Sequence, residues 1–132
     1  MFISHSWKYD DDYKRLVALL DKEPYFKRNY KNYSVTKDDP IPAINDRDLK
    51  ESLEDQIRPA SVVLIPAGMY THLNNSKWIN AEIKIAKAFP KPIIAIKPWG
   101  ALIFPREIIK EADETVGWNG SSIVDAIKRL AN

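Results

Sequence analysis

The sequence has no cysteine, only four glycines and no long apolar run. Without cysteine, the chain can form no disulfide, no thiolate metal site and no cysteine nucleophile. No apolar run approaches the roughly 18–20 residues that span a bilayer, so we expect no membrane partner. The first residues, 1–5, do not form a basic segment followed by a long apolar stretch, so no secretory signal is visible. A chain of 132 residues then predicts one soluble, cytoplasmic domain spanning 1–132.

The sequence also lacks a strong charge of either sign. Its 20 basic and 18 acidic residues give a net charge of +2. Residues 25–33 mix basic and aromatic side chains in a way that imitates a platform for single-stranded nucleic acid. This segment precedes a weak edge strand, so we interpret it as a solvated connection with a few core anchors. We therefore expect no nucleic-acid partner.

Short apolar runs alternate with amphipathic patterns of helical period. The predicted strands are 2–3, 33–35, 61–65, 92–96 and 114–116. The predicted helices are 10–20, a segment from Asp48 until Pro59, about 77–89, one or two weak turns around 106–111, and a last helix capped by Ser121 or Ser122. This order predicts an α/β fold with helices on both faces of a five-stranded parallel sheet, in the flavodoxin-like order 2-1-3-4-5.

Ligands of such sheets bind beyond the carboxyl ends of the strands, so the loops to inspect are 4–9, 36–45, 66–76 and 97–105. The residues after the first and third strands, 4–6 and 65–67, contain no acid that could hold Mg²⁺ or accept phosphate. This excludes a phosphoreceiver domain. The loop after the first strand has no glycine, which argues against a flavodoxin, and P-loop and dinucleotide fingerprints are absent. His5 and His72 have no neighbouring carboxylate at ligand spacing, so no metal site is expected.

One carboxylate lies where a helical pattern predicts an apolar residue. On a helical wheel of the segment 77–89, Glu82 falls in the middle of the apolar stripe, opposite Lys84 and Lys87. An inward carboxylate costs several kcal/mol unless it is paired, hydrogen-bonded or protonated. Two interpretations remain: a structural ion pair at the helix start, or a carboxylate that binds a sugar hydroxyl and stabilises a developing cation. Trp7, Trp78 and Trp99 lie at or just beyond strand ends, where they could stack on a flat heterocycle or pack in the core.

Several segments, taken together, resemble TIR domains. The resemblance rests on Phe2-Ile3-Ser4-His5-Ser6 at the first strand, Asp38-Asp39-Pro40-Ile41 after the second, the third strand 60–66, the helix motif Trp78-Ile79-Asn80-Ala81-Glu82-Ile83, and the segments 92–99 and 116–118. These matches extend over nearly the whole chain in the family's order and spacing. The chain is most similar to the short bacterial TIR-like proteins of the Thoeris antiphage type.

This resemblance implies an activity and a set of site residues. In catalytic TIR domains the glutamate at the position of Glu82 is required to break the nicotinamide–ribose bond of NAD⁺. NAD⁺ is then a substrate rather than a cofactor, and the products are nicotinamide and linear or cyclic ADP-ribose, the latter a signal. The implied substrate-binding residues are Ser4, His5, Ser6, Trp7, Lys8, Asp38, Ile41 and Trp78. Some relatives carry arginines just after the first-strand motif; this chain has none there, so the source of the phosphate contacts stays open, with Lys8 as one candidate. The resemblance further implies self-association and a downstream effector that responds to the product.

Two other functions remain open at this point. Many TIR domains are non-catalytic protein–protein interaction modules, in which Glu82 would serve only packing or an ion pair. A nucleoside deoxyribosyltransferase has a similar fold and also attacks an N-glycosidic bond. In that enzyme Glu82 would be a covalent nucleophile and would carry the sugar during turnover.

Overall fold

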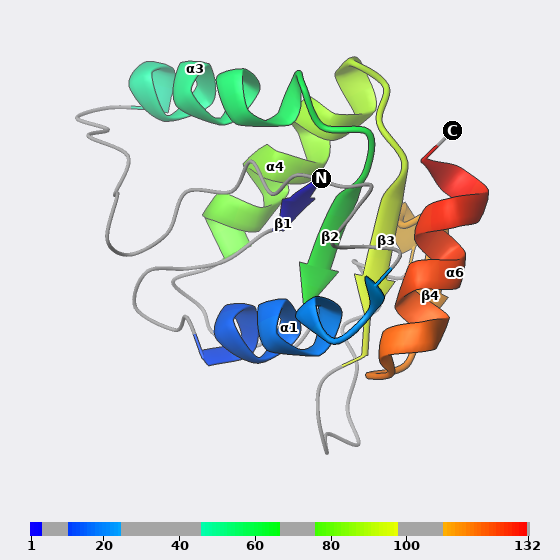
Figure 1. The fold of residues 1–132 in the computed structure, drawn as a ribbon. Coiled ribbons are helices and arrows are strands. Elements are labelled where there is room, and N and C mark those ends of the chain that lie inside the picture. Colours follow the sequence, from blue (N-terminus) through cyan, green and yellow to red (C-terminus); the bar gives the residue numbers. More distant parts are fainter. Residues whose placement is uncertain (4–10, 25–45, 67–75, 98–109, 132) are drawn as a thin grey trace.

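The computed structural model describes residues 1–3, 11–24, 46–66, 76–97 and 110–131. Four strands in this part of the chain form a single parallel sheet, which Figure 1 shows at the centre of the molecule. The strands are β1 (Phe2–Ile3), β2 (Val63–Pro66), β3 (Ile93–Ile96) and β4 (Glu114–Val116). Their spatial order is β1-β2-β3-β4, with Phe2 opposite Val63 and Val63 opposite Ile93.

The sheet agrees with part of the predicted topology. The predicted first, third, fourth and fifth strands are present, and they are parallel neighbours in that order. The predicted second strand, 33–35, lies outside the described residues, so the five-stranded order 2-1-3-4-5 stays a prediction. The strands form here because the two central runs consist of β-branched and other apolar residues, which suit a sheet covered on both faces.

Helices cover both faces of this sheet (Figure 1). One core cluster joins α3 (Asp46–Ile57) and α4 (Ser76–Ala88) to the strands, and another joins α1 (Asp11–Asp21) and α6 (Gly120–Leu130) to the opposite face. Side chains that alternate along a strand point to opposite faces. Val63 and Ile65 of β2 therefore lie in the α3/α4 cluster. Leu64 of β2 and Val62, just before this strand, lie in the α1/α6 cluster.

Helix starts differ from the predictions at two places. Helix α3 begins at Asp46, so Asp48 lies inside its first turn rather than before it. The last helix is capped by Asn119 and not by Ser121 or Ser122: the Asn119 side chain accepts a hydrogen bond from the Ser122 backbone N–H at 3.0 Å. Asn119 has the extended backbone conformation of a cap, which places its side-chain oxygen over the first turn. Of the predicted turns around 106–111, the described residues 110 and 111 are helical.

The amino-terminal edge of the sheet is held by short connections and direct hydrogen bonds. Only residues 58–62 join α3 to β2, and residues 89–92 join α4 to β3. At the start of β3, Asp113 makes two bonds with Ile93. Its carboxylate accepts from the Ile93 N–H at 2.8 Å, and its own N–H donates to the Ile93 carbonyl at 2.8 Å. The starts of β3 and β4 are thereby fixed relative to each other.

Candidate functional site

Glu82 lies in the second turn of α4 and is completely buried. Its neighbours Ile83, Ile85 and Ala86 are buried as well, and they belong to the core cluster between α4 and the sheet. The other side of the helix is exposed at Asn80, Lys84 and Lys87. This confirms that the carboxylate lies within the apolar stripe of the helix, as the wheel predicted.

The environment of this carboxylate is unusual for an acid. Among the described residues, Glu82 is the one charged side chain that is buried. Its Oε2 atom accepts no hydrogen bond from the described part of the chain, although Glu82 as a residue does have an interaction partner. Taking a carboxylate out of water costs several kcal/mol unless the group is paired, hydrogen-bonded or protonated. A group held in this way is a candidate for function as well as for a structural contact.

Topology determines the end of the sheet to which Glu82 belongs. Because the strands are parallel, β1, β2 and β3 all end at the same edge, at Ile3, Pro66 and Ile96. Only four residues separate the end of helix α4 from the start of β3, so the last turn of α4 lies at the amino-terminal edge and its first turns lie toward the carboxyl edge (Figure 1). Glu82 is therefore near the carboxyl edge, where ligands of such sheets bind.

The structure places Glu82 but not the other predicted site residues. Ser4, His5, Ser6, Trp7, Lys8, Asp38 and Ile41 lie outside the described residues, as do His72 and Trp99. The backbone of Trp78 belongs to α4, one turn before Glu82, while its side chain is not among those described. The grouping of these residues around Glu82 stays a prediction.

A second feature was not predicted from the sequence. A pocket of about 370 Å³ lies between α3 and α4 and is lined by Lys50, Glu54, Ala81, Lys84, Ile85, Ala88 and Phe89. The sequence does contain a signal for it, because Ala81 and Ala88 stand two turns apart on one side of α4. Small side chains at such positions leave space beside a neighbouring helix.

The described part of the chain has neither a metal-binding cluster nor a membrane-spanning helix. It contains no group of three or more histidine, aspartate or glutamate side chains arranged to hold a metal ion. None of the described helices has the length and apolar character that crossing a membrane demands.

Comparison with known proteins identifies the family. The family model described as "Thoeris protein ThsB, TIR-like domain" matches residues 2–102, which is 101 of the 132 residues. The match includes β1, β2, β3 and the whole of α4 with Glu82. No curated protein matches the chain. The chain belongs to the family of Thoeris ThsB TIR-like domains, as the resemblance of its sequence motifs indicated.

Proposed function

We propose that this domain cleaves the bond between nicotinamide and ribose in NAD⁺, and that Glu82 is its catalytic residue. The observation that carries the proposal is a fully buried carboxylate in the second turn of α4, close to the edge of the sheet where the strands end. Membership of a TIR-like family supports the same reaction, because catalytic TIR domains use a glutamate in the corresponding helix motif.

A single carboxylate is sufficient for this chemistry. When the C–N bond breaks, its electron pair goes to the positively charged nicotinamide ring, which leaves as a neutral molecule and needs no proton. The ribose carbon is left with oxocarbenium character, and a nearby carboxylate stabilises that positive charge. Water then adds to the carbon and loses a proton, which gives ADP-ribose. Attack by another nucleophilic atom of the same ADP-ribose unit gives a cyclic product instead.

The burial of Glu82 adds a condition to this mechanism. Glu82 has no exposed surface, so a substrate reaches its carboxylate only after the residues that cover it move apart. Once a substrate fills the opened site and displaces water from it, the negative charge of Glu82 interacts strongly with a developing cation. We expect turnover to require a state in which the cleft is open, such as a self-associated form.

The cellular role that we propose follows from the reaction. The domain would act in the cytoplasm as part of an antiphage response, and its nucleotide product would act on a separate effector. In this proposal NAD⁺ is a consumed substrate and no cofactor is needed.

The test is incubation of concentrated protein with NAD⁺, with nicotinamide and nucleotide products followed by chromatography and mass spectrometry. The variant Glu82→Gln keeps the size of the side chain and removes its charge. Glu51→Gln is the matched control, because it makes the same change at an exposed position of α3. We expect release of nicotinamide by the wild type and by Glu51→Gln, and a loss of at least 100-fold in Glu82→Gln.

Other outcomes favour the other functions. Equal rates in the wild type and in Glu82→Gln would remove Glu82 from the chemistry. If the wild type releases no nicotinamide and its assembly with partners is unchanged in Glu82→Gln, the domain is a non-catalytic interaction module. Turnover of deoxynucleosides with a sugar attached to Glu82, detected by mass spectrometry, would identify a deoxyribosyltransferase.

A further inference from the structure

The pocket between α3 and α4 has the composition of a small-molecule site. Its apolar part comes from Ala81, Ile85 and Ala88 of α4 and from Phe89, which directly follows that helix. Its polar part comes from Lys50 and Glu54 of α3 and from Lys84 of α4. A volume of about 370 Å³ lies within the range of pockets that bind small ligands, which combine a mainly apolar lining with a few polar groups.

The charges around the pocket do not cancel. Lys50 lies 3.8 Å from Glu54 on the next turn of α3, so these two charges compensate each other. Lys84 is exposed and makes no ion pair with any residue in the described ranges. The described residues that line the pocket therefore carry a net positive charge beside an apolar surface. A ligand that matches both features has an apolar body and one anionic group.

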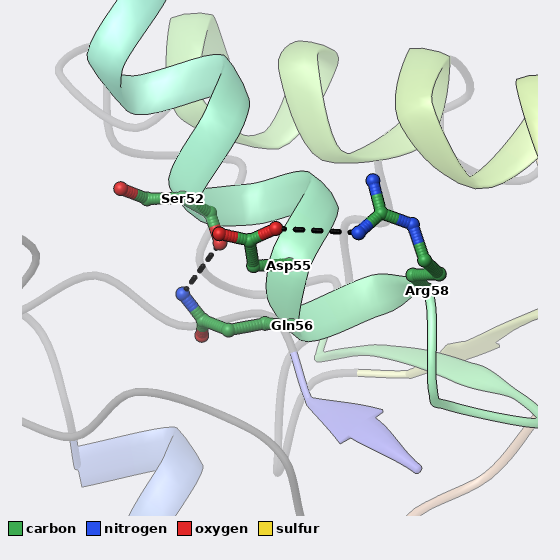
Figure 2. Close-up of polar contacts among 4 residues, drawn as sticks. All are labelled: Ser52, Asp55, Gln56 and Arg58. Atoms are coloured by element: carbon green, nitrogen blue, oxygen red, sulfur yellow. Dashed lines mark hydrogen bonds and ion pairs between the residues drawn. The ribbon is translucent and has the colours of Figure 1, made fainter.

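The aromatic end of the pocket is fixed by a contact from outside it. The guanidinium of Arg58, just after the end of α3, lies 5.7 Å from the centre of the Phe89 ring. Arg58 is itself held by Asp55 at 3.3 Å, and Figure 2 shows this pair beside the hydrogen bond from Gln56 to the Ser52 carbonyl. This contact is a modest attraction at an exposed site, and the Phe89 ring is further restrained because it packs against the α3/α4 core cluster. A restrained ring offers a preformed surface for a flat apolar ligand.

We propose that the pocket between α3 and α4 binds a small organic anion, with its apolar body against Ala81, Ile85, Ala88 and Phe89 and its anionic group at Lys84. The site is distinct from the proposed catalytic cleft, because Glu82 does not line it. The proposal does not depend on NAD⁺ cleavage.

The test uses two fluorescent probes that share the same aromatic rings. Anilinonaphthalene sulfonate carries one anionic group, and phenylnaphthylamine has the same rings without it. Binding of each probe to the full chain is measured by fluorescence titration, and amide NMR spectra locate the bound probe. The variants are Lys84→Gln, which removes the positive charge, and Ala88→Leu, which fills the pocket from an exposed helix position. Lys87→Gln is the matched control, since Lys87 is exposed on the same helix and does not line the pocket.

The expected pattern separates charge from apolar contact. We expect the sulfonate to bind more tightly than the neutral probe and to shift amides of α3 and α4. Lys84→Gln should weaken binding of the sulfonate about fivefold, because an exposed charge contact contributes modestly. It should leave the affinity for the neutral probe unchanged. Ala88→Leu should weaken the binding of both probes at least tenfold, because the larger side chain fills the space that a bound probe would occupy. Lys87→Gln should change neither affinity.

Three results would overturn the proposal. One is equal affinity for the two probes in the wild type. Another is amide shifts confined to residues outside α3 and α4. The third is a dimer in sedimentation experiments that Ala88→Leu dissociates, because a second copy of the chain would then be the occupant of the pocket.

Discussion

The two faces of the sheet differ in what is buried beneath their helices. The face under α1 and α6 is packed by a cluster of buried side chains that are all apolar. On the other face, α4 brings a buried carboxylate into its apolar stripe, and a pocket opens between α4 and α3. Within the part of the chain that the structure describes, the buried residues of the first face serve packing. The second combines stability with a group whose burial costs free energy, which is typical of a face that carries a function.

The largest effects should come from apolar positions, and they should be similar on the two faces. Ile127 of α6 and Ile57 of α3 are both fully buried, one in each cluster. Replacing either by alanine should lower the free energy of unfolding by about 2–5 kcal/mol, through lost burial and a new cavity. Urea denaturation measures this loss. Asp125→Ala, at an exposed position of α6, is the control and should cost less than about 0.5 kcal/mol. A loss below about 1 kcal/mol on one face would show that this face is loosely packed.

An intermediate effect of opposite sign is expected at Glu82. Glu82→Gln keeps the shape of the side chain but removes the charge that is costly to bury. We expect the free energy of unfolding to rise by about 1 kcal/mol, measured by urea denaturation beside Glu51→Gln, which should be neutral. A protein made more stable and less active by the same substitution would locate the function on the α3/α4 face. A loss of 2 kcal/mol or more would instead identify Glu82 as part of a structural ion pair.

The smallest effects should come from ion pairs that join elements at the surface of each face. Lys87 of α4 lies 3.2 Å from Glu111, and Arg129 of α6 contacts Glu114 of β4. All four side chains are at least one quarter exposed, so solvent screens both pairs. Double-mutant cycles should give coupling energies below about 1 kcal/mol for each pair, and these should fall as salt is added. A coupling of 2 kcal/mol or more in one pair would reveal a difference between the faces that packing does not explain.

Much of the fold was predictable because its signals are local. The runs around Val63 and Ile93 are apolar on both faces, which is sufficient to predict buried parallel strands. The residue that caps the last helix could not be predicted from a local signal. Asn119, Ser121 and Ser122 are all residues that favour this position, and the backbone conformation decides between them.

In the candidate site, too, only the residue with a local sequence signal could be predicted. Glu82 could be found from the sequence because a charge in the middle of an apolar stripe breaks a helical period. No such period fixes the placement of Ser4–Lys8, Asp38 or Ile41, so their roles rest on the family resemblance and stay predictions. The pocket required the structure, because Lys50 and Lys84 line it from two different helices whose packing the sequence does not specify.

The bonds between Asp113 and Ile93 have a consequence for engineering this framework. They fix the start of β3 against the residue that precedes β4, at the edge where the connections 58–62 and 89–92 are short. Changes of length at that edge would displace strand starts and therefore the whole register. The segments that follow Ile3, Pro66 and Ile96 leave from the opposite edge, so they can be exchanged for loops from other family members without touching these bonds. Exchanges of segments at that opposite edge would therefore leave the pairing of the β3 and β4 starts intact.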